Sequence, residues 1–202
     1  MKIFECDAVV VGTGCAGYNC ADWLYDFGCK NILIVTEGVK VGTSRNTGSD
    51  KQTYYKLSLA GNDGDSVKSM AETLFAGGAM DGDLALTEAA NSAKSFFKLV
   101  SLGVRFPMNA YGEYVGYKTD HDPFQRATSV GPYTSKMMTE ALENSVLKKG
   151  IKILDGCAAL RVLKDEEGVQ GLLALDLTAN DKTEYIAIKS PHVVLATGGP
   201  AG

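Results

Sequence analysis

Histidine and cysteine are scarce in this sequence and are not clustered. Its 202 residues include two histidines, His121 and His192, and five cysteines, none of which forms a C-x-x-C pair. Since a structural zinc site needs grouped cysteine and histidine ligands, the sequence argues against one. An odd number of cysteines without such spacing is typical of reduced thiols, and we expect a cytoplasmic protein.

The sequence also lacks any basic stretch and any long apolar run. Lysine and arginine number 20 against 24 aspartates and glutamates, which gives a net charge of −4 and argues against a nucleic-acid partner. No segment is long and apolar enough to predict a membrane span. Glu5 and Asp7 interrupt the N-terminal apolar run, which argues against a secretory signal.

Glycine, by contrast, forms a motif near the N-terminus. Residues 6–12 predict a short buried strand, and Gly12, Gly14 and Gly17 then form G-x-G-x-x-G. A helix is predicted next, ending at Gly28 and followed by a second apolar strand that ends at Glu37. The buried face of this helix is predicted to hold Ala16, Cys20, Trp23, Leu24 and Phe27, with Asn19, Asp22 and Asp26 on the other side.

Each part of this unit suits an adenine dinucleotide. Gly12 permits the tight turn from strand to helix, Gly14 lets the backbone approach a pyrophosphate, and Gly17 lets the helix pack closely on the sheet. The helix N-terminus offers free N–H groups to phosphates, and Glu37 is placed to accept the ribose hydroxyls. The alternative is a glycine-rich turn in an ordinary α/β fold, with Glu37 a solvated loop residue. Cys15 is expected to be a small residue that fits the loop rather than a redox group.

Beyond Glu37, periodicity predicts three more helices and a set of strands. The helices are expected over residues 65–80, 84–102 and 134–149. The second of them has an expected apolar face of Leu84, Leu86, Ala89, Ala90, Ala93, Phe96, Phe97 and Val100. Between the second and third lies an irregular aromatic lobe with one hairpin at Tyr111–Gly112. The last fifty residues predict a three-stranded antiparallel layer with a turn at Glu167–Gly168.

Four segments together resemble a known family. Gly12, Gly14, Gly17 and Glu37 match its ADP-binding loop, and the run from Thr43 to Ser49 resembles the segment that passes the flavin ring. Arg126, followed eight residues later by Thr134, resembles its R…D-x-T-G element, and residues 196–199 resemble its A-T-G-G strand end. The chain thus resembles, over essentially its whole length, the flavoprotein subunits of the succinate dehydrogenase, fumarate reductase and L-aspartate oxidase group.

The resemblance implies the fold and the cofactor. The fold is α/β, a Rossmann-like FAD-binding domain over residues 1–202 with a parallel sheet, a flanking antiparallel β-layer, and a helical and irregular insertion at residues 50–130. The cofactor is FAD, which the glycine motif alone does not distinguish from NAD. The residues assigned to the cofactor are Gly12, Gly14, Cys15, Ala16, Gly17, Glu37, Gly38, Thr43, Ser44, Thr47, Gly48, Ala158, Ala196, Thr197 and Gly198.

The chain departs from the family pattern at four positions. Ser49 stands where a second glycine is usual, Pro132 where an aspartate is usual, and Ser135 where a glycine is usual. Gly42 falls where the covalently flavinylated members carry their histidine. No histidine precedes His121 in the sequence, so FAD is expected to be held non-covalently.

Two residues of the irregular lobe have alternative interpretations. His121, between Asp120 and Asp122, is either a catalytic group whose pKa the flanking carboxylates raise or an exposed loop histidine, and we expect the second. Arg126 either binds a substrate carboxylate or organises the loop.

The function implied is that of an oxidoreductase that passes a hydride between the flavin N5 atom and a small dicarboxylate-like substrate, with an iron–sulfur or other electron-transfer partner. The alternatives are an adenylylsulfate-reductase-like or other flavin oxidoreductase of the same group, and a non-catalytic dinucleotide-binding module. In the family, a capping domain carries the substrate-binding and catalytic groups. We therefore expect this chain to be the N-terminal part of a longer parent, without capping and C-terminal portions, with no catalytic residue and inactive alone.

Overall fold

The computed structural model describes residues 1–61, 64–120, 122–179 and 183–199. The chain forms two compact units, one made of Met1–Thr47 with Ser135–Gly202 and the other of Gly48–Thr134. We call them the first and the second unit. The second unit covers the insertion expected at residues 50–130, and the assignment of the whole chain to one domain stays a prediction.

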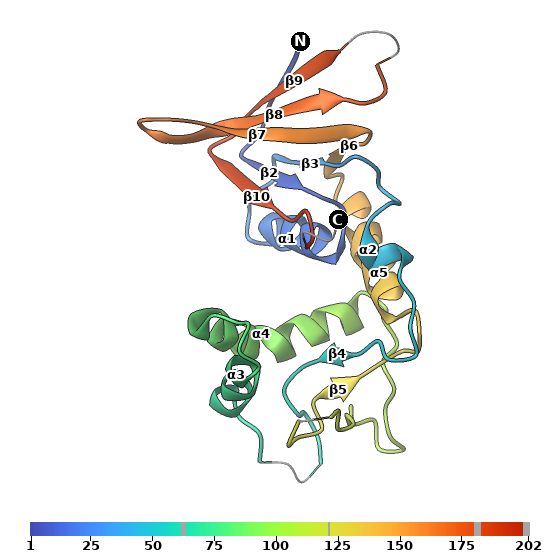
Figure 1. Cartoon of the computed structure of the whole chain (residues 1–202). Helices are drawn as coiled ribbons and strands as arrows, with labels where there is room; N and C mark the ends of the chain where they lie inside the picture. The colour runs from blue at the N-terminus through green and yellow to red at the C-terminus, as the bar shows by residue number, and fades with distance from the viewer. Residues whose placement is uncertain (62–63, 121, 180–182, 200–202) are drawn as a thin grey trace. The chain divides into compact units, whose positions relative to one another are not determined.

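A parallel sheet lies at the centre of the first unit (Figure 1). Its strands, in spatial order, are β10 (His192–Leu195), β2 (Ala8–Val11), β3 (Ile32–Val35) and β6 (Lys152–Leu154). Every residue of β2 and β3 is buried, as expected for continuous apolar runs in a sheet covered on both faces. The expected Rossmann-like α/β fold is confirmed.

A second sheet is ordered β1 (Lys2–Glu5), β9 (Glu184–Lys189), β8 (Gly168–Asp176) and β7 (Cys157–Asp165). The antiparallel pairing of β7, β8 and β9 matches the prediction. The expected count of three strands is wrong, because β1 pairs in parallel with β9. β1 was missed because its short KIFE segment has a charged residue at each end and no continuous apolar run; three of its four residues are exposed.

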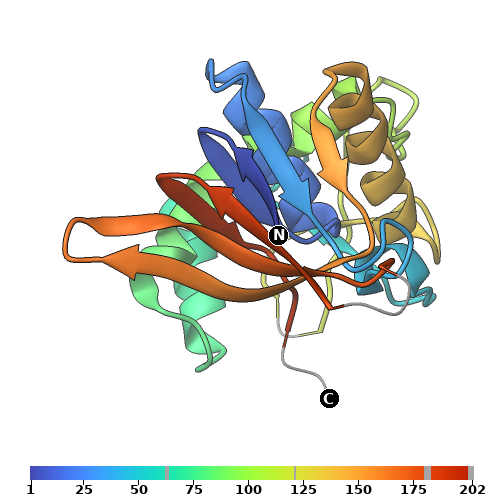
Figure 2. The same cartoon turned by 90° about the horizontal axis from the view of Figure 1, so that it is seen from above.

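The two sheets pack face to face around an apolar core. It is formed by Val9, Val11, Leu33 and Val35 of the parallel sheet and Leu172, Ala174, Ile186 and Ile188 of the other sheet. Helices α1 (Cys15–Asp26) and α5 (Thr134–Lys148) cover the opposite face of the parallel sheet (Figures 1 and 2). The first unit is therefore layered as sheet, sheet and helices.

The buried face of α1 differs from the prediction. Its buried residues are Gly17, Tyr18, Ala21 and Asp22, whereas Phe27 is 72% exposed. Asp22 can be buried because its Oδ1 atom accepts a hydrogen bond from Ser145 at 2.5 Å and pairs with the Lys149 ammonium at 2.8 Å. Hydrophobic periodicity missed this face, since two of its members are small and two are polar groups with partners on or just after α5.

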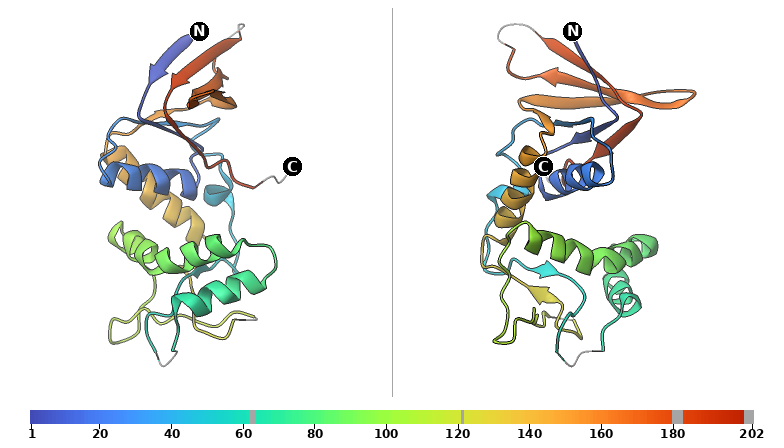
Figure 3. Two further views of the ribbon diagram at one scale, coloured as in Figure 1. Left: turned by 90° about the vertical axis from the view of Figure 1, so that its left-hand side faces the viewer. Right: turned by 180° about the vertical axis from the view of Figure 1, so that it is seen from behind.

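The second unit is built from two helices and a two-stranded sheet (Figure 3). Helix α3 (Val67–Ala76) lies beside α4 (Gly82–Ser101), and β4 (Tyr54–Tyr55) pairs with β5 (Ala127–Thr128). Side chains cap both helices: Ser66 accepts the Ser69 N–H, and Asp81 accepts the N–H groups of Asp83 and Leu84.

The buried face of α4 also differs from the prediction. The buried residues are Ala85, Ala89, Ser92, Phe96 and Leu99, while Leu84, Leu86 and Phe97 are about half exposed or more. Phe96 lies within 6 Å of the ring centroids of Tyr54, Phe106 and Tyr114, so aromatic contacts set this face. At Tyr111–Gly112 the chain forms a turn closed by a hydrogen bond from Gly112 to Asn109, not a strand hairpin.

Candidate cofactor-binding site

Two glycines of the loop are required by packing alone. Gly12 has φ 108°, and a Cβ atom there would lie 2.4 Å from the Ala196 carbonyl oxygen. A Cβ atom at Gly17 would lie 2.0 Å from the Gly12 carbonyl oxygen. The backbone of β10, the loop and α1 therefore approach one another more closely than any side chain allows.

Gly14 is different, because a side-chain oxygen rather than a backbone atom lies opposite its Cβ position. It is the N-cap of α1, and no side chain caps the helix from that position. A Cβ atom there would meet only the Ser44 hydroxyl oxygen, at 3.3 Å. A helix N-terminus without a capping side chain at Gly14 suits a pyrophosphate group, since the first N–H groups and the helix dipole both favour an anion. The loop thus fits the phosphates of a dinucleotide.

Hydrogen bonds fix the loop against the end of β3. The hydroxyl groups of Thr13 and Thr36 lie 2.9 Å apart and both donate to the Gly38 carbonyl oxygen, at 3.3 and 3.2 Å. Glu37 is held between Thr36 and Gly38 with its side chain exposed. Its carboxylate is therefore at the strand end where the sequence expected it and is accessible to a ligand.

The remaining members of the site in the first unit come from β7 and from the chain after β10. Ala158 follows Cys157, whose N–H donates to the Thr36 carbonyl oxygen at 2.8 Å, so Ala158 lies beside the end of β3. The Ala196 N–H donates to the Val11 carbonyl oxygen at 2.9 Å, and its methyl group lies 3.6 Å from the Cβ position of Gly17. Thr197 and Gly198 continue from there, with Gly198 at φ 85°.

Helix α2 (Thr43–Asn46) places the segment that is expected to pass the flavin ring next to the glycine loop. The Ser44 hydroxyl accepts the Cys15 N–H at 3.3 Å, in the first turn of α1 next to Ala16. Thr43 and Thr47 are exposed and are joined by a hydrogen bond from the Thr47 hydroxyl to the Thr43 carbonyl oxygen.

Gly48 belongs to the second unit rather than to the loop's unit. A Cβ atom there would lie 2.9 Å from the Tyr133 ring, which is 60% exposed, so a larger residue would have to displace that ring. Its assignment to the cofactor stays a prediction, as do the other site assignments.

The Cys15 thiol is packed rather than activated. Its sulfur lies 2.9 Å from the Thr139 hydroxyl and 3.6 Å from the Ser135 carbonyl oxygen. Burial raises the pKa of the Cys15 thiol, although hydrogen bonds from Thr139 and Ser44 and the Arg45 charge act against it. A raised pKa disfavours the reactive thiolate, which supports the interpretation of Cys15 as a residue that fits the loop.

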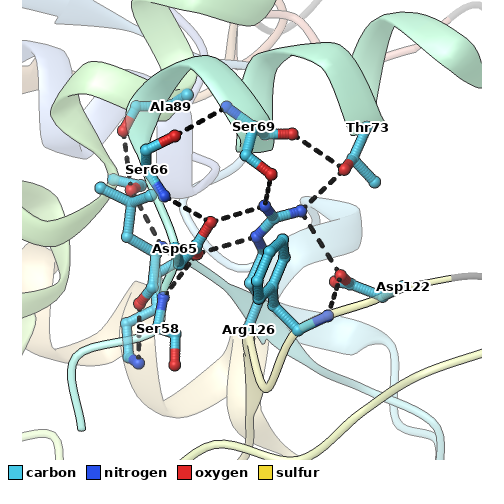
Figure 4. A network of polar contacts seen from close by, with 12 residues as sticks. Ser58, Asp65, Ser66, Ser69, Thr73, Ala89, Asp122 and Arg126 are labelled. Carbon is cyan, nitrogen blue, oxygen red and sulfur yellow. Dashed lines mark hydrogen bonds and ion pairs between the residues drawn. The ribbon is translucent and has the colours of Figure 1, made fainter. Parts of the chain in front are cut away.

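Arg126 lies in the second unit and is fully buried (Figure 4). Its Nε and Nη2 atoms donate to the two Asp65 carboxylate oxygens at 2.9 and 2.7 Å. The other hydrogen bonds of the guanidinium go to Tyr55, Ser69, Thr73 and Asp122. Because each of its nitrogens already donates within the unit, Arg126 organises the loop and leaves no donor for a substrate carboxylate.

Some expected features can be judged only for part of the chain. His121 lies outside the described residues. Among the residues that the structure describes, no group of three His, Cys, Asp or Glu side chains could hold a metal ion. None of the described helices has the length and apolar character that crossing a bilayer requires.

A parallel sheet in which a glycine loop joins a strand to the N-terminus of a helix is the arrangement of α/β dinucleotide-binding proteins. Residues 7–202 match the family model for the FAD binding domain, and the chain belongs to this family. It is 28% identical over 203 residues to fumarate reductase (cytochrome) of Shewanella frigidimarina and 25% identical over 197 residues to L-aspartate oxidase of Streptomyces coelicolor. Each alignment covers 96% of this chain and 33% of the relative, so the chain spans about a third of their length.

Solved structures show the same fold. The E. coli quinol fumarate reductase superposes with a TM-score of 0.81 at 20% identity, over 98% of this chain and 33% of that chain. Adenylylsulfate reductase of Archaeoglobus fulgidus superposes with a TM-score of 0.67 at 19% identity, over 98% and 31% of the two chains. The resemblance to the fumarate reductase group is confirmed, and the cofactor of this family is FAD.

Proposed function

We propose that the site around Gly14 binds FAD non-covalently and that the chain is the FAD-binding part of a flavin-dependent oxidoreductase. The observation that carries the proposal is the glycine loop that leads from β2 into the N-terminus of α1, where Gly14 provides no capping side chain. Backbone packing requires Gly12 and Gly17, whereas a Cβ atom at Gly14 would meet only the Ser44 hydroxyl oxygen within 4 Å, at 3.3 Å.

Different residues of the first unit bind different parts of the cofactor. The N–H groups that open α1 bind the pyrophosphate, and Glu37 accepts hydrogen bonds from the adenosine ribose. Ala158 provides backbone beside the adenine end, while Thr43, Ser44 and Thr47 lie along the flavin end, with Ala196 to Gly198 closing the loop. When bound, FAD supplies hydride acceptance and donation at its N5 atom.

We further propose that the whole protein acts on a small dicarboxylate-like substrate and exchanges electrons with an iron–sulfur or other electron-transfer partner. The curated relatives, a fumarate reductase and an L-aspartate oxidase, support this choice. The likeness to adenylylsulfate reductase keeps that activity as the second candidate. Reduction of fumarate, but not of adenylylsulfate, by the whole protein is the expected result.

Acid precipitation tests how the flavin is held. Gly42 stands where a histidine would be needed for attachment, so acid should release the flavin of the FAD-loaded protein into the supernatant. Flavin retained in the pellet would contradict the non-covalent site. Titration with FAD and competition by ADP test the site itself, because ADP carries the pyrophosphate and ribose that the loop is proposed to bind.

A further inference from the structure

Arg45 connects α2 to α5 within the first unit. Its side chain is only 11% exposed although α2 has no buried residue. One terminal nitrogen donates to Glu140 at 3.4 Å, and the other forms an ion pair with Glu143. Both acids are on α5, three residues apart, so they lie on one face of that helix.

Glu143 extends this connection to α1. Its second carboxylate oxygen accepts a hydrogen bond from the Tyr18 hydroxyl at 3.2 Å. Tyr18 is fully buried, and burial together with the neighbouring Glu143 raises the pKa of its hydroxyl. The phenol therefore stays protonated and donates to Glu143. One carboxylate thus holds Arg45 of α2 and Tyr18 of α1.

The Arg45 pair is largely shielded from water. The Glu143 side chain is 16% exposed, against 42% for Glu140. A shielded, charge-assisted pair holds its geometry better than an exposed one. Ser44, the residue before Arg45 in α2, is the one whose hydroxyl accepts the Cys15 N–H. The position of Ser44 over the loop therefore depends on how Arg45 is anchored.

We propose that Arg45 is the positioning residue of the flavin segment, residues 43–47. Through Glu143, it holds this segment against α1 and α5 in the place that the flavin end of FAD requires. The inference rests on the proposed FAD site and adds the residue that sets the affinity for the flavin half. It predicts that loss of Arg45 weakens FAD binding and spares ADP binding.

Loss of Arg45 should affect the two halves of FAD differently, because different contacts support the two parts of the proposed site. The ADP half uses Gly14, the first turn of α1 and Glu37, which Thr13, Thr36 and Gly38 fix to β3 without Arg45. Release of α2 would only free the Cys15 N–H from Ser44, and a phosphate oxygen can accept that N–H instead. Residues 43–47, which are proposed to hold the flavin half, are tied to α5 through Arg45.

Calorimetric titration of the 202-residue chain with FAD and with ADP tests the proposal. For Arg45→Met we expect FAD affinity to fall at least tenfold and ADP affinity to stay within twofold. Arg45→Lys keeps the charge without the planar fork and should recover part of the loss. Arg161→Met is the matched control, because Arg161 is exposed on β7, and it should change neither affinity.

Other outcomes overturn specific claims. An equal loss of FAD and ADP affinity in Arg45→Met, or no loss of either, contradicts the positioning role of Arg45. Neither result contradicts the proposed FAD site itself. Failure of the unaltered chain to bind FAD and ADP overturns the proposed site and this inference with it. If Arg45→Met does not fold, Glu143→Gln provides the test, since it keeps an acceptor for Tyr18 and should show the same selective loss.

Discussion

The glycine loop of the first unit and Arg126 of the second unit differ in how they use their polar groups. At the loop, the N-terminus of α1 has no capping side chain at Gly14, and a Cβ atom there would meet only the Ser44 hydroxyl oxygen within 4 Å. Arg126, by contrast, is fully buried, and each of its nitrogens donates to a neighbour, Asp65 above all. The guanidinium has therefore used its donors within the second unit.

This difference separates a binding site from a structural network. Burial and charge alone would have ranked Arg126 above the glycine loop as a candidate site, because buried charged groups are rare. A group whose donors are satisfied inside the fold gains nothing from a ligand, however. The start of α1 is therefore the candidate ligand site, and variants in the two units should fail in different ways.

The largest expected effect is on the stability of the second unit. Asp65→Ala leaves the Arg126 charge buried without its bidentate partner and should destabilise the protein by about 3–5 kcal/mol. Glu72→Ala is the control, since Glu72 forms an exposed pair with Lys68 and should cost under about 1 kcal/mol. Urea unfolding measures both, and similar losses would mean that the Arg126 network is not structural.

The glycine loop should lose binding without losing stability. Gly14→Val places a branched side chain where the pyrophosphate is proposed to approach the backbone and should weaken FAD by at least about a hundredfold, or about 2.8 kcal/mol. The unfolding midpoint should change little, because the Cβ atom would meet only a side-chain oxygen, that of Ser44 at 3.3 Å. Gly17→Ala should lose both, because its Cβ atom would meet the Gly12 carbonyl oxygen at 2.0 Å. Calorimetry and thermal unfolding distinguish the two, and equal FAD affinity in Gly14→Val and the unaltered chain would remove the loop from the site.

Glu37 should contribute to affinity alone. Glu37→Ala removes charge-assisted hydrogen bonds to the ribose worth about 1.5–3 kcal/mol, so FAD affinity should fall about ten- to hundredfold. Stability should hardly change, since the side chain is exposed. A variant within twofold of the unaltered chain in the same titration would make Glu37 a solvated loop residue.

A more gradual effect, spread over the pH scale, concerns the buried Lys56 of the second unit. Its ammonium donates to the Leu57 carbonyl oxygen at 3.3 Å and lies 4.9 Å from the Phe96 ring centroid, and burial lowers its pKa to about 8. Between pH 8 and about 10 the unfolded chain binds the proton that the folded chain has lost, so stability should rise by up to about 1.4 kcal/mol per pH unit.

Lys56→Met isolates this contribution. The variant should be more stable than the unaltered chain at pH 7, and the difference should shrink as the pH rises above 8. Urea unfolding of both proteins at several pH values measures it. A difference that does not vary with pH would mean that Lys56 titrates normally.

The sequence determined the α/β fold and the core of the candidate site. Gly12, Gly14, Gly17 and Glu37 are local signals, because a strand, a tight turn and a helix N-terminus are built from residues close together in the chain. The apolar runs of β2 and β3 likewise predicted a parallel sheet buried on both faces. FAD, in preference to NAD, required the additional resemblance to a family.

The tertiary structure alone decided which polar residues are buried and with which partners. Asp22 pairs with Lys149, Arg45 with Glu143 and Arg126 with Asp65, across separations of 127, 98 and 61 residues. Hydrophobic periodicity assigns Asp22 to the solvent face, because it takes no account of a partner on a distant element. Burial of a charge is favourable only where the fold brings its counter-charge within hydrogen-bonding distance, and that proximity is a property of the folded chain rather than of any local pattern.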